Sequence, residues 1–341
     1  MLPLQTDSNW FYKIPKIELH LHLEGAIPLP AMWELVKKYG GNRSVKDIDE
    51  LKERFRYSDF SHFIETWIWK NQFIREYDDF TLIGEAVAQE LSRINIRYSE
   101  VFYSPPDFAK HGLIPQEITG AIRKGIDLVP TVEVALIADL VRDFGPQMAE
   151  TTLDQVREVI DQGVIGIGLG GSEADFPAEL FSDVFEHARK LDFRTTAHAG
   201  EAAGSSSVWS VINNLKVDRI GHGTRAFEDP RLVSFLAAKH IPLEVCPRSN
   251  VCTGAVNSLQ EHPVRDYFNQ GLSLTINTDD PVMFDTSLPQ EYSALVSDLK
   301  FSYEDIKSLI LNAIESSWLP SDQKLNLVKQ FVSDPAWDAH E

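Results

Sequence analysis

Short aliphatic and β-branched runs alternate with longer amphipathic stretches along this chain of 341 residues. A short apolar run is typical of a buried strand, and apolar residues spaced by three and four indicate one face of a helix. Their alternation favours parallel βα units over an antiparallel fold. We predict eight strands, at residues 16–22, 97–103, 131–138, 164–169, 193–198, 219–222, 242–245 and 273–277.

Eight strands with helices between them are the elements of one closed (β/α)8 TIM barrel, a fold of the α/β class. No internal repeat, low-complexity tract or linker divides the chain. We therefore expect residues 1–341 to form a single barrel domain, which is simpler than two domains of half that size.

A long helical insert is predicted between the first two strands, over about residues 28–96. Within it, segment 57–73 carries apolar residues at helical spacing, among them Phe60, Phe63 and Ile64. These side chains either pack on the barrel or form a lid over the pocket mouth and contact substrate. The second alternative arises because a segment after strand 1 emerges at the catalytic face of a barrel.

Charge limits the classes of molecule that the protein can bind, and cysteine content bears on its compartment. The net charge of −19 would repel a phosphate backbone, and no Lys/Arg run offers an exception, so we expect a small-molecule substrate and no nucleic acid. Two cysteines cannot form a disulfide framework. The N-terminal segment lacks the features of a signal peptide, and no apolar run reaches 18 residues. We expect a cytoplasmic protein without membrane contact; the oligomeric state stays open.

Histidines and carboxylates fall at the predicted strand ends. His20 and His22 close strand 1 and point to the same side, about 6 to 7 Å apart at Cα. His198 ends strand 5, and Asp279 follows strand 8. Since the C-terminal strand ends of a barrel meet at one face, these four residues predict a metal site. Nitrogen and oxygen ligands without cysteine suit zinc, with iron, manganese and cobalt as alternatives.

Three further polar residues stand beside the predicted ligands. Glu201 follows His198 by three residues and is free to donate a proton. His222 lies between two glycines and is expected to deprotonate or orient a water that zinc activates. Asp280, next to Asp279, is left to hydrogen-bond the substrate or that water.

Six motifs in this order carry a family resemblance: HLHLEG, GLGGSE, HAGEAAGSS, RIGHGTRA, CPRSNVCTGAV and SLTINTDDPVMF. Together they resemble the adenosine deaminase family of the amidohydrolase superfamily, over about residues 14–285. The H-x-E and P-C-x-x-C pattern of the cytidine deaminase type does not occur in the chain.

The resemblance implies a role for each residue. His20, His22, His198 and Asp279 would bind a single zinc ion. Glu201 would protonate N1 of the purine, His222 would handle the proton of the attacking water, and Asp280 would contact that water and N7. Gly171 matches a glycine whose backbone amide contacts N3. The reaction implied is hydrolytic deamination at C6, which releases ammonia.

The substrate implied is a 6-aminopurine nucleoside such as adenosine or deoxyadenosine. Glu24, in HLEG, stands where adenosine-specific members usually have an aspartate that binds the ribose 5′-hydroxyl. Its longer side chain keeps adenine, aminofutalosine and N6-substituted adenines open as alternatives. RIGHG and NTDDP resemble the nucleoside branch more than the adenine branch. An alternative of another class is a barrel that binds zinc or a nucleoside without catalysis.

Overall fold

Eight short strands lie side by side in chain order, each parallel to the next. The computed structural model describes residues 10–339. The strands are β1 (Lys16–His22), β2 (Ile96–Tyr103), β3 (Glu133–Asp139), β4 (Val164–Gly168), β5 (Arg194–Ala199), β6 (Arg219–His222), β7 (Leu243–Val245) and β8 (Leu274–Ile276). The predicted set of eight strands is confirmed, and no strand end differs from its prediction by more than two residues.

The end of β1 is bonded to the segment that follows β8, so the barrel is nearly closed. Leu21 forms a parallel bridge with Asp279. The backbone N–H of His22 donates to the carbonyl of Asp279 at 2.8 Å, and the N–H of Asp279 donates to the carbonyl of His20 at 3.1 Å. These bonds hold the end of β1 against the segment that follows β8.

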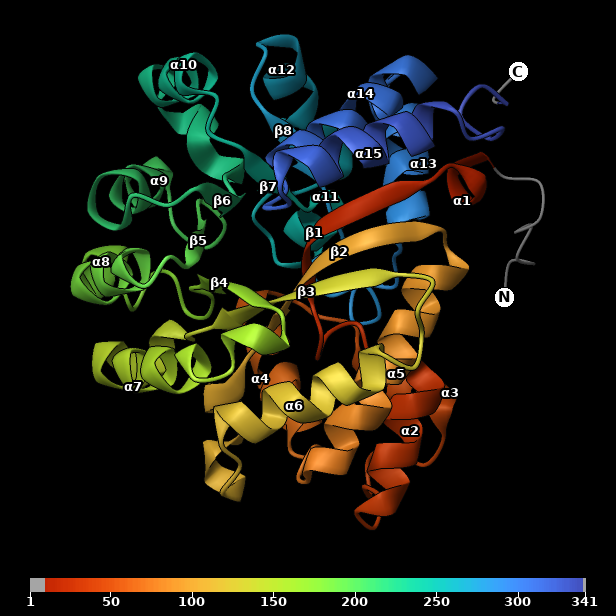
Figure 1. The fold of residues 1–341 in the computed structure, drawn as a ribbon, viewed down its shortest axis with the longest axis vertical. Coiled ribbons are helices and arrows are strands. Elements are labelled where there is room, and N and C mark those ends of the chain that lie inside the picture. The colour runs from red at the N-terminus through yellow and green to blue at the C-terminus, as the bar shows by residue number, and fades with distance from the viewer. Residues whose placement is uncertain (1–9, 340–341) are drawn as a thin grey trace.

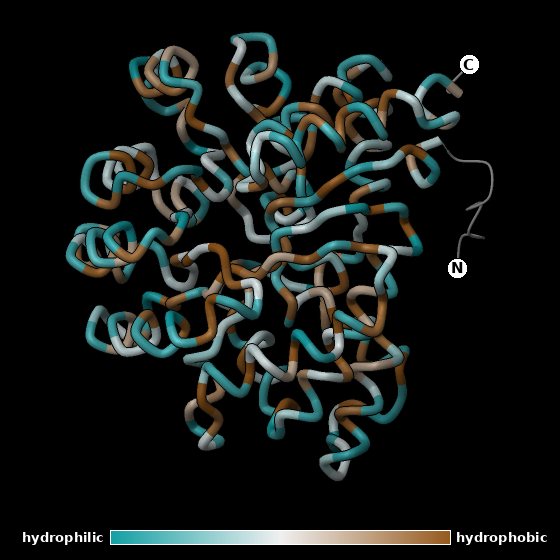
Figure 2. The backbone as a smooth tube through the Cα atoms, in the orientation of Figure 1, coloured by the Kyte–Doolittle hydropathy of each residue, from teal (hydrophilic) through white to brown (hydrophobic). Residues whose placement is uncertain are grey.

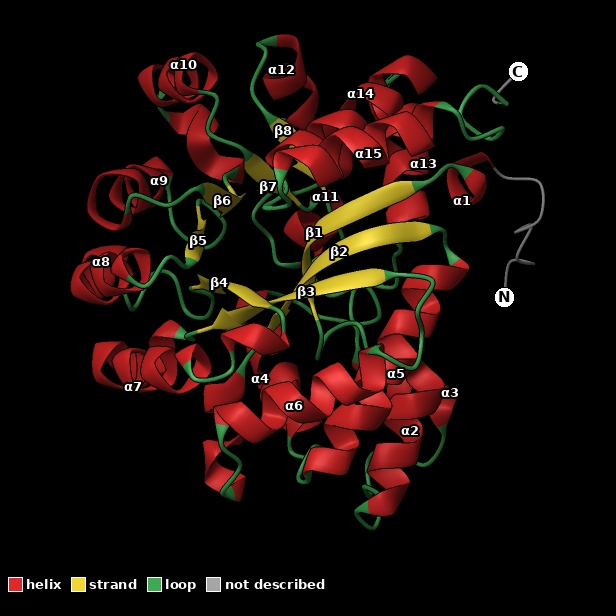
Figure 3. Ribbon diagram, viewed as in Figure 1, coloured by secondary structure: helices red, strands yellow, loops and turns green. Residues whose placement is uncertain are grey.

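Helices surround the strands (Figures 1 and 3). They are α1 (Trp10–Lys13), α2 (Leu29–Lys38), α3 (Ile48–Arg54), α4 (Phe60–Asn71), α5 (Tyr77–Arg93), α6 (Pro115–Ile126), α7 (Gly145–Arg157), α8 (Ser182–Lys190), α9 (Ser205–Ser210), α10 (Pro230–Lys239), α11 (Pro247–Cys252), α12 (Val264–Asn269), α13 (Leu288–Leu299), α14 (Tyr303–Ser316) and α15 (Ser321–Val332). The arrangement is a nearly closed (β/α)8 barrel, as the sequence predicts. Within the described part of the chain, no helix is both long and apolar enough to span a membrane.

The insert after β1 contains helices α2 to α5. In Figure 1, α2, α3 and α5 lie with α6 on one side of strands β1 to β3, and α13 to α15 lie on the other. Helix α4 is shorter than the predicted segment 57–73. It begins at Phe60 because the Asp59 carboxylate caps it, accepting from the N–H of His62 at 2.9 Å.

The strands form the apolar centre of the molecule. Every residue of β1, β6, β7 and β8 is buried. Figure 2 shows hydrophobic residues along much of the strands and many hydrophilic residues on the outer helices. This burial leaves His20 and His22 in a dry environment, where an imidazole needs a specific partner.

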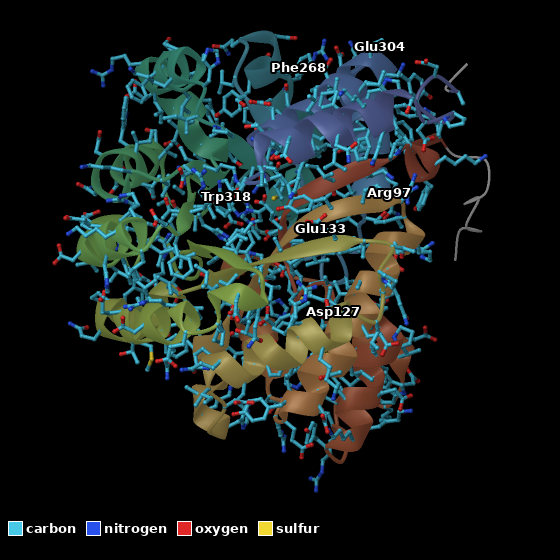
Figure 4. All side chains as sticks on the ribbon, in the orientation of Figure 1. Arg97, Asp127, Glu133, Phe268, Glu304 and Trp318 are labelled. Carbon is cyan, nitrogen blue, oxygen red and sulfur yellow. The ribbon has the colours of Figure 1, made fainter. Side chains whose placement is uncertain are left out.

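A buried ion-pair network lies among the strands. The Arg219 guanidinium lies 2.6 Å from the Glu100 carboxylate and 2.5 Å from the Glu244 carboxylate. Trp318, labelled in Figure 4, stacks on this guanidinium with its ring centroid 3.7 Å from Cζ. All three charged residues are almost inaccessible to solvent. The network fixes Glu244, which in turn reaches the candidate site.

Candidate active site

Three imidazoles and one carboxylate meet where β1, β5 and β8 end. Ligand atoms of His20, His22 and His198 lie within 4.8 Å of one another. Oδ1 of Asp279 lies 3.5 Å from Nε2 of His20 and 3.3 Å from Nε2 of His22. The structure therefore brings together the four residues that the sequence predicts as ligands.

The donor set fits a zinc ion. Nε2 of His20 and Nε2 of His198 are buried and make no hydrogen bond of good geometry within the described chain. Two ligands about 2.05 Å from a tetrahedral zinc lie about 3.3 Å apart, close to the Asp279–imidazole separations given above. Nitrogen and oxygen donors without a thiolate suit zinc, so this is a candidate metal site.

Glu244 orients the first imidazole. Its Oε2 lies 2.8 Å from Nδ1 of His20, so the Nδ1–H of His20 donates to the carboxylate and Nε2 faces the site. Against the effect of burial, the carboxylates of Asp279 and Glu244 raise the pKa of His20 to about 10, so a metal that binds Nε2 would displace a proton. Burial of Glu244 tends to raise its pKa, but the charge of Arg219 and the hydrogen bond with His20 lower the pKa to about 2. The strong acceptor behind His20 is therefore ionised at neutral pH.

The other three predicted ligands differ in what makes them available to a metal ion. Burial lowers the pKa of His22 to about 3 and that of His198 well below its usual range, so both imidazoles keep free lone pairs at pH 7. Ser249 donates to Oδ2 of Asp279 at 2.6 Å, which leaves Oδ1 facing His20 and His22. The backbone of Asp279 has φ of +66°, a strained conformation of the kind that gathers at functional sites.

Glu201 is held above the ligands by a network centred on Glu173. The Glu173 carboxylate accepts from the N–H groups of Gly200 at 2.6 Å and Glu201 at 3.1 Å, and from those of the next two residues. Burial, and then the charges of Asp279 and Glu173, raise the pKa of Glu201 to about 8. This carboxyl group therefore carries a proton at neutral pH, as a general acid must.

His222 and Asp280 complete the centre. Nε2 of His222 lies 3.4 Å from Oε2 of Glu201 and 4.0 Å from Oδ2 of Asp279. Asp280 has a buried Oδ1 without a hydrogen-bond partner in the described structure. Burial and the neighbouring Asp279 raise its pKa well above the usual range. A Cβ at Gly25 would lie 1.7 Å from this Oδ1, which explains the glycine of HLEG.

A cavity of about 150 Å³ opens above these groups. His22, His198, Glu201, Asp279 and Asp280 form its polar floor, and Gly171 lies on its wall. The apolar part is lined by Phe60, Phe63, Ile64, Trp67, Ile68, Val141 and Phe144. Phe60, Phe63 and Ile64 of α4 line this cavity, and Phe63 also packs on Phe284 with ring centroids 5.1 Å apart. Their contact with a substrate stays a prediction.

Three carboxylates that the sequence analysis did not single out lie on the cavity wall: Asp107, Asp139 and Asp143. Asp107 accepts from the Trp67 indole at 2.8 Å. Asp139 accepts from the Gly170 N–H at 2.7 Å, and burial raises its pKa to about 6. Asp139 ends β3, so the strand-end rule that found the ligands could have found it as well.

Glu24 does not lie on the cavity wall. Its Oε1 accepts from the N–H of Ser104 at 2.9 Å, and Ser104 is the residue that reaches the cavity. Its Oε2 is buried without a hydrogen-bond partner in the described chain, and burial raises its pKa to about 7. Direct contact between Glu24 and a substrate stays a prediction.

Comparison with known proteins identifies the family of the chain. The adenosine deaminase family model matches residues 15–333. The chain belongs to the adenosine deaminase family. It is therefore similar throughout to hydrolases that remove an amino group from purine-type substrates.

The relatives of this adenosine deaminase family member act on different adenine compounds. An aminodeoxyfutalosine deaminase of Streptomyces avermitilis is 34% identical over 93% of this chain and 90% of that protein. An adenine deaminase of Crocosphaera subtropica is 33% identical over 93% of this chain and 98% of that protein. An adenosine deaminase of Clostridium kluyveri is 29% identical over 94% of each. The alternative of a non-catalytic barrel is not supported.

Solved structures agree on the fold. An amidohydrolase from Burkhoderia ambifaria with bound Zn has a TM-score of 0.88 and 26% identity, over 96% of this chain and 92% of that one. The Arabidopsis N6-mAMP deaminase has a TM-score of 0.86 and 25% identity, over 95% and 98%. The family member described here is thus an enzyme that deaminates an adenine-type substrate, with a candidate His/Asp metal site like that expected for a zinc enzyme.

Proposed function

We propose that this chain deaminates a 6-aminopurine nucleoside, such as adenosine or deoxyadenosine, to the 6-oxopurine nucleoside and ammonia. One observation carries the proposal: Glu201, Asp280 and Gly171 line the same cavity as His22, His198 and Asp279. A proton donor, polar groups for the purine ring and a candidate metal site thus surround one space.

His20, His22, His198 and Asp279 would hold the zinc ion. When bound, zinc lowers the pKa of a coordinated water from about 15.7 to near 7 and so supplies the nucleophile for C6. The family resemblance supports this ligand set, as does the separation of its donor atoms.

The remaining residues act on the purine itself. Glu201, protonated at neutral pH, donates its proton to N1, and this makes C6 more electrophilic. Asp280 and the backbone of Gly171 orient the ring through N7 and N3. The apolar side chains of Phe60, Phe63 and Ile64 exclude water from the bound base. The amino group on the tetrahedral C6 then takes the proton of the new hydroxyl group, the C6–N bond breaks, and ammonia leaves behind the 6-oxo group.

The charge of the cavity wall supports a substrate without a phosphate. None of the described residues that line the cavity is Lys or Arg, whereas Asp107, Asp139 and Asp143 are carboxylates. A phosphate about 4 Å from one ionised carboxylate would be repelled by about 4 kcal/mol at an effective dielectric constant of 20. That repulsion weakens binding by a factor of about 10³. The same carboxylates are good acceptors for sugar hydroxyl groups.

A second candidate is an adenine-type compound with a larger substituent, and aminodeoxyfutalosine is the compound to test. Two exposed side chains at the cavity mouth favour it: Ile68 is 56% exposed and Phe144 is 45% exposed. An apolar substituent would cover both. The relative of 34% identity points to the same compound.

A substrate panel tests the proposal. Ammonia release is measured with adenosine, deoxyadenosine, adenine, aminofutalosine, N6-methyladenosine and AMP at equal zinc loading. The expected result is turnover of a nucleoside with kcat/KM exceeding that for AMP by about 10³, since the two differ only by the phosphate. Preferred turnover of adenine or AMP would contradict the nucleoside assignment, and preference for aminofutalosine would select the second candidate.

A further inference from the structure

A chain of buried polar groups ends on His222 from the side opposite to the cavity. Nδ1 of His222 lies 3.1 Å from Nδ2 of Asn250 on α11. Oδ1 of Asn250 lies 2.6 Å from the Thr224 hydroxyl and 3.1 Å from Nε2 of His262. Asn250, Thr224 and His262 are at most 4% exposed. None of them contacts the candidate ligands through a hydrogen bond among those described.

The last hydrogen bond of this series, at Val264, decides the direction of all the others. The backbone N–H of Val264 lies 3.1 Å from Nδ1 of His262 and can only donate. Nδ1 of His262 is therefore the acceptor, and the ring hydrogen of His262 is on Nε2. That N–H points at the Asn250 side chain and requires the amide oxygen there. If the amide NH₂ group faced His262 instead, two donors would lie opposite each other.

The amide orientation decides the tautomer of His222. With its oxygen turned to His262 and Thr224, Asn250 presents its NH₂ group to Nδ1 of His222. Nδ1 of His222 is then an acceptor without hydrogen, so the hydrogen of the neutral ring is on Nε2. Nε2 is the atom that faces Glu201 at 3.4 Å.

We infer that Asn250 and His262 are positioning residues that hold His222 with its hydrogen on Nε2, so that His222 meets the attacking water as a hydrogen-bond donor. This inference rests on the proposed deamination. A neutral ring in this tautomer has no lone pair at Nε2 and cannot take a proton there. Of the two roles that the sequence left open for His222, the chain of hydrogen bonds selects orientation of the water over its deprotonation.

The inference predicts the effect of Asn250→Asp. Aspartate keeps the shape of asparagine and still accepts from Thr224 and His262, but it offers His222 only an acceptor. The hydrogen of the neutral His222 ring would then be on Nδ1, and Nε2 would face the site with a lone pair. We expect kcat to fall by about 10², with KM and zinc content unchanged. Asn213→Asp adds the same charge at an exposed position and should leave kcat unchanged.

A second pair of variants separates positioning from packing. His262→Gln retains an amide N–H that can donate to Asn250, whereas His262→Leu has no polar group. Rescue of kcat by glutamine relative to leucine supports positioning. Equal kcat values in the two variants would contradict it, because loss of packing alone affects both.

The tautomer itself can be read without substrate. Two-bond ¹H–¹⁵N correlation spectra distinguish the two ring nitrogens, and the His222 signals among ten histidines are found by comparison with His222→Gln. We expect hydrogen on Nε2 in the wild-type chain and on Nδ1 in Asn250→Asp. Hydrogen on Nδ1 in the wild-type chain would overturn the inference. Failure of the substrate panel would instead refute the deamination, since the spectra do not depend on turnover.

Discussion

Glu201→Gln tests the proposed proton donor. Glutamine keeps the size of the side chain and can still donate a hydrogen bond to N1, but it cannot transfer a proton. Glu201 is not among the four predicted ligands, so the variant should keep its zinc. The change therefore removes general acid catalysis with little change to the shape of the cavity.

The magnitude follows from the environment of Glu201. Burial, and then Asp279 and Glu173, raise its pKa to about 8. At pH 7 the protonated form then exceeds the ionised form by about tenfold, whereas an ordinary glutamate would be almost fully ionised. Because the active form is the protonated one, kcat/KM should be highest below pH 8 and fall as the pH rises through about 8. Loss of the donor should lower kcat/KM by about 10² to 10⁴, or about 3 to 5 kcal/mol.

The assay compares ammonia release by the wild-type chain, Glu201→Gln and Glu65→Gln across pH 6 to about 10. Glu65 is an exposed residue of α4, so its variant makes the same chemical change outside the cavity and should behave as wild type. The Glu201→Gln profile should lack the decline above about pH 8. Wild-type activity in Glu201→Gln at equal zinc content would refute the role of Glu201.

Three other changes have defined outcomes. His20→Ala should lose both bound zinc and activity, and a metal analysis that finds one zinc per chain in the variant would show that the ligand set is wrong. Gly25→Ala places a Cβ 1.7 Å from Oδ1 of Asp280, so we expect kcat/KM to fall by about tenfold or more at normal zinc content; unchanged kinetics would argue against a role for Asp280. Glu244→Gln should weaken zinc binding by about 10- to 100-fold in a chelator competition, and equal affinity would mean that the bond to His20 does not orient it for the metal.

The sequence was sufficient to predict the barrel and the residues at its strand ends. Parallel strands place their C-terminal ends on one face, so His20, His22, His198 and Asp279 could be predicted to meet without knowledge of their contacts. The strand boundaries followed to within two residues, because short runs that contain aliphatic or β-branched residues alternate with longer amphipathic stretches.

The residues behind the ligands could not be predicted in this way. Glu244 contacts His20 across 224 residues of sequence, and Asn250 contacts His222 across 28. Such pairs depend on the register between neighbouring strands and on the course of the loops, which residue patterns do not encode. Asp107 and Asp143 lie in the loops after β2 and β3, where no periodicity indicates which side chains face a cavity.

Glu24 shows the limit of reading a motif residue by residue. The motif HLEG predicts that the Glu24 carboxylate contacts substrate, whereas its Oε1 accepts from the Ser104 N–H and Glu24 does not line the cavity. The backbone partner of a side chain depends on a neighbouring strand, in this case β2, and cannot be read from the motif itself.

Anomalous diffraction at the zinc absorption edge, from crystals of the zinc-loaded protein, tests the central claim most directly. We predict one peak per chain, with the nitrogens of His20, His22 and His198 and an oxygen of Asp279 at about 2.0 to 2.2 Å from it. A peak held by other residues, or none at the ends of β1, β5 and β8, would contradict the account.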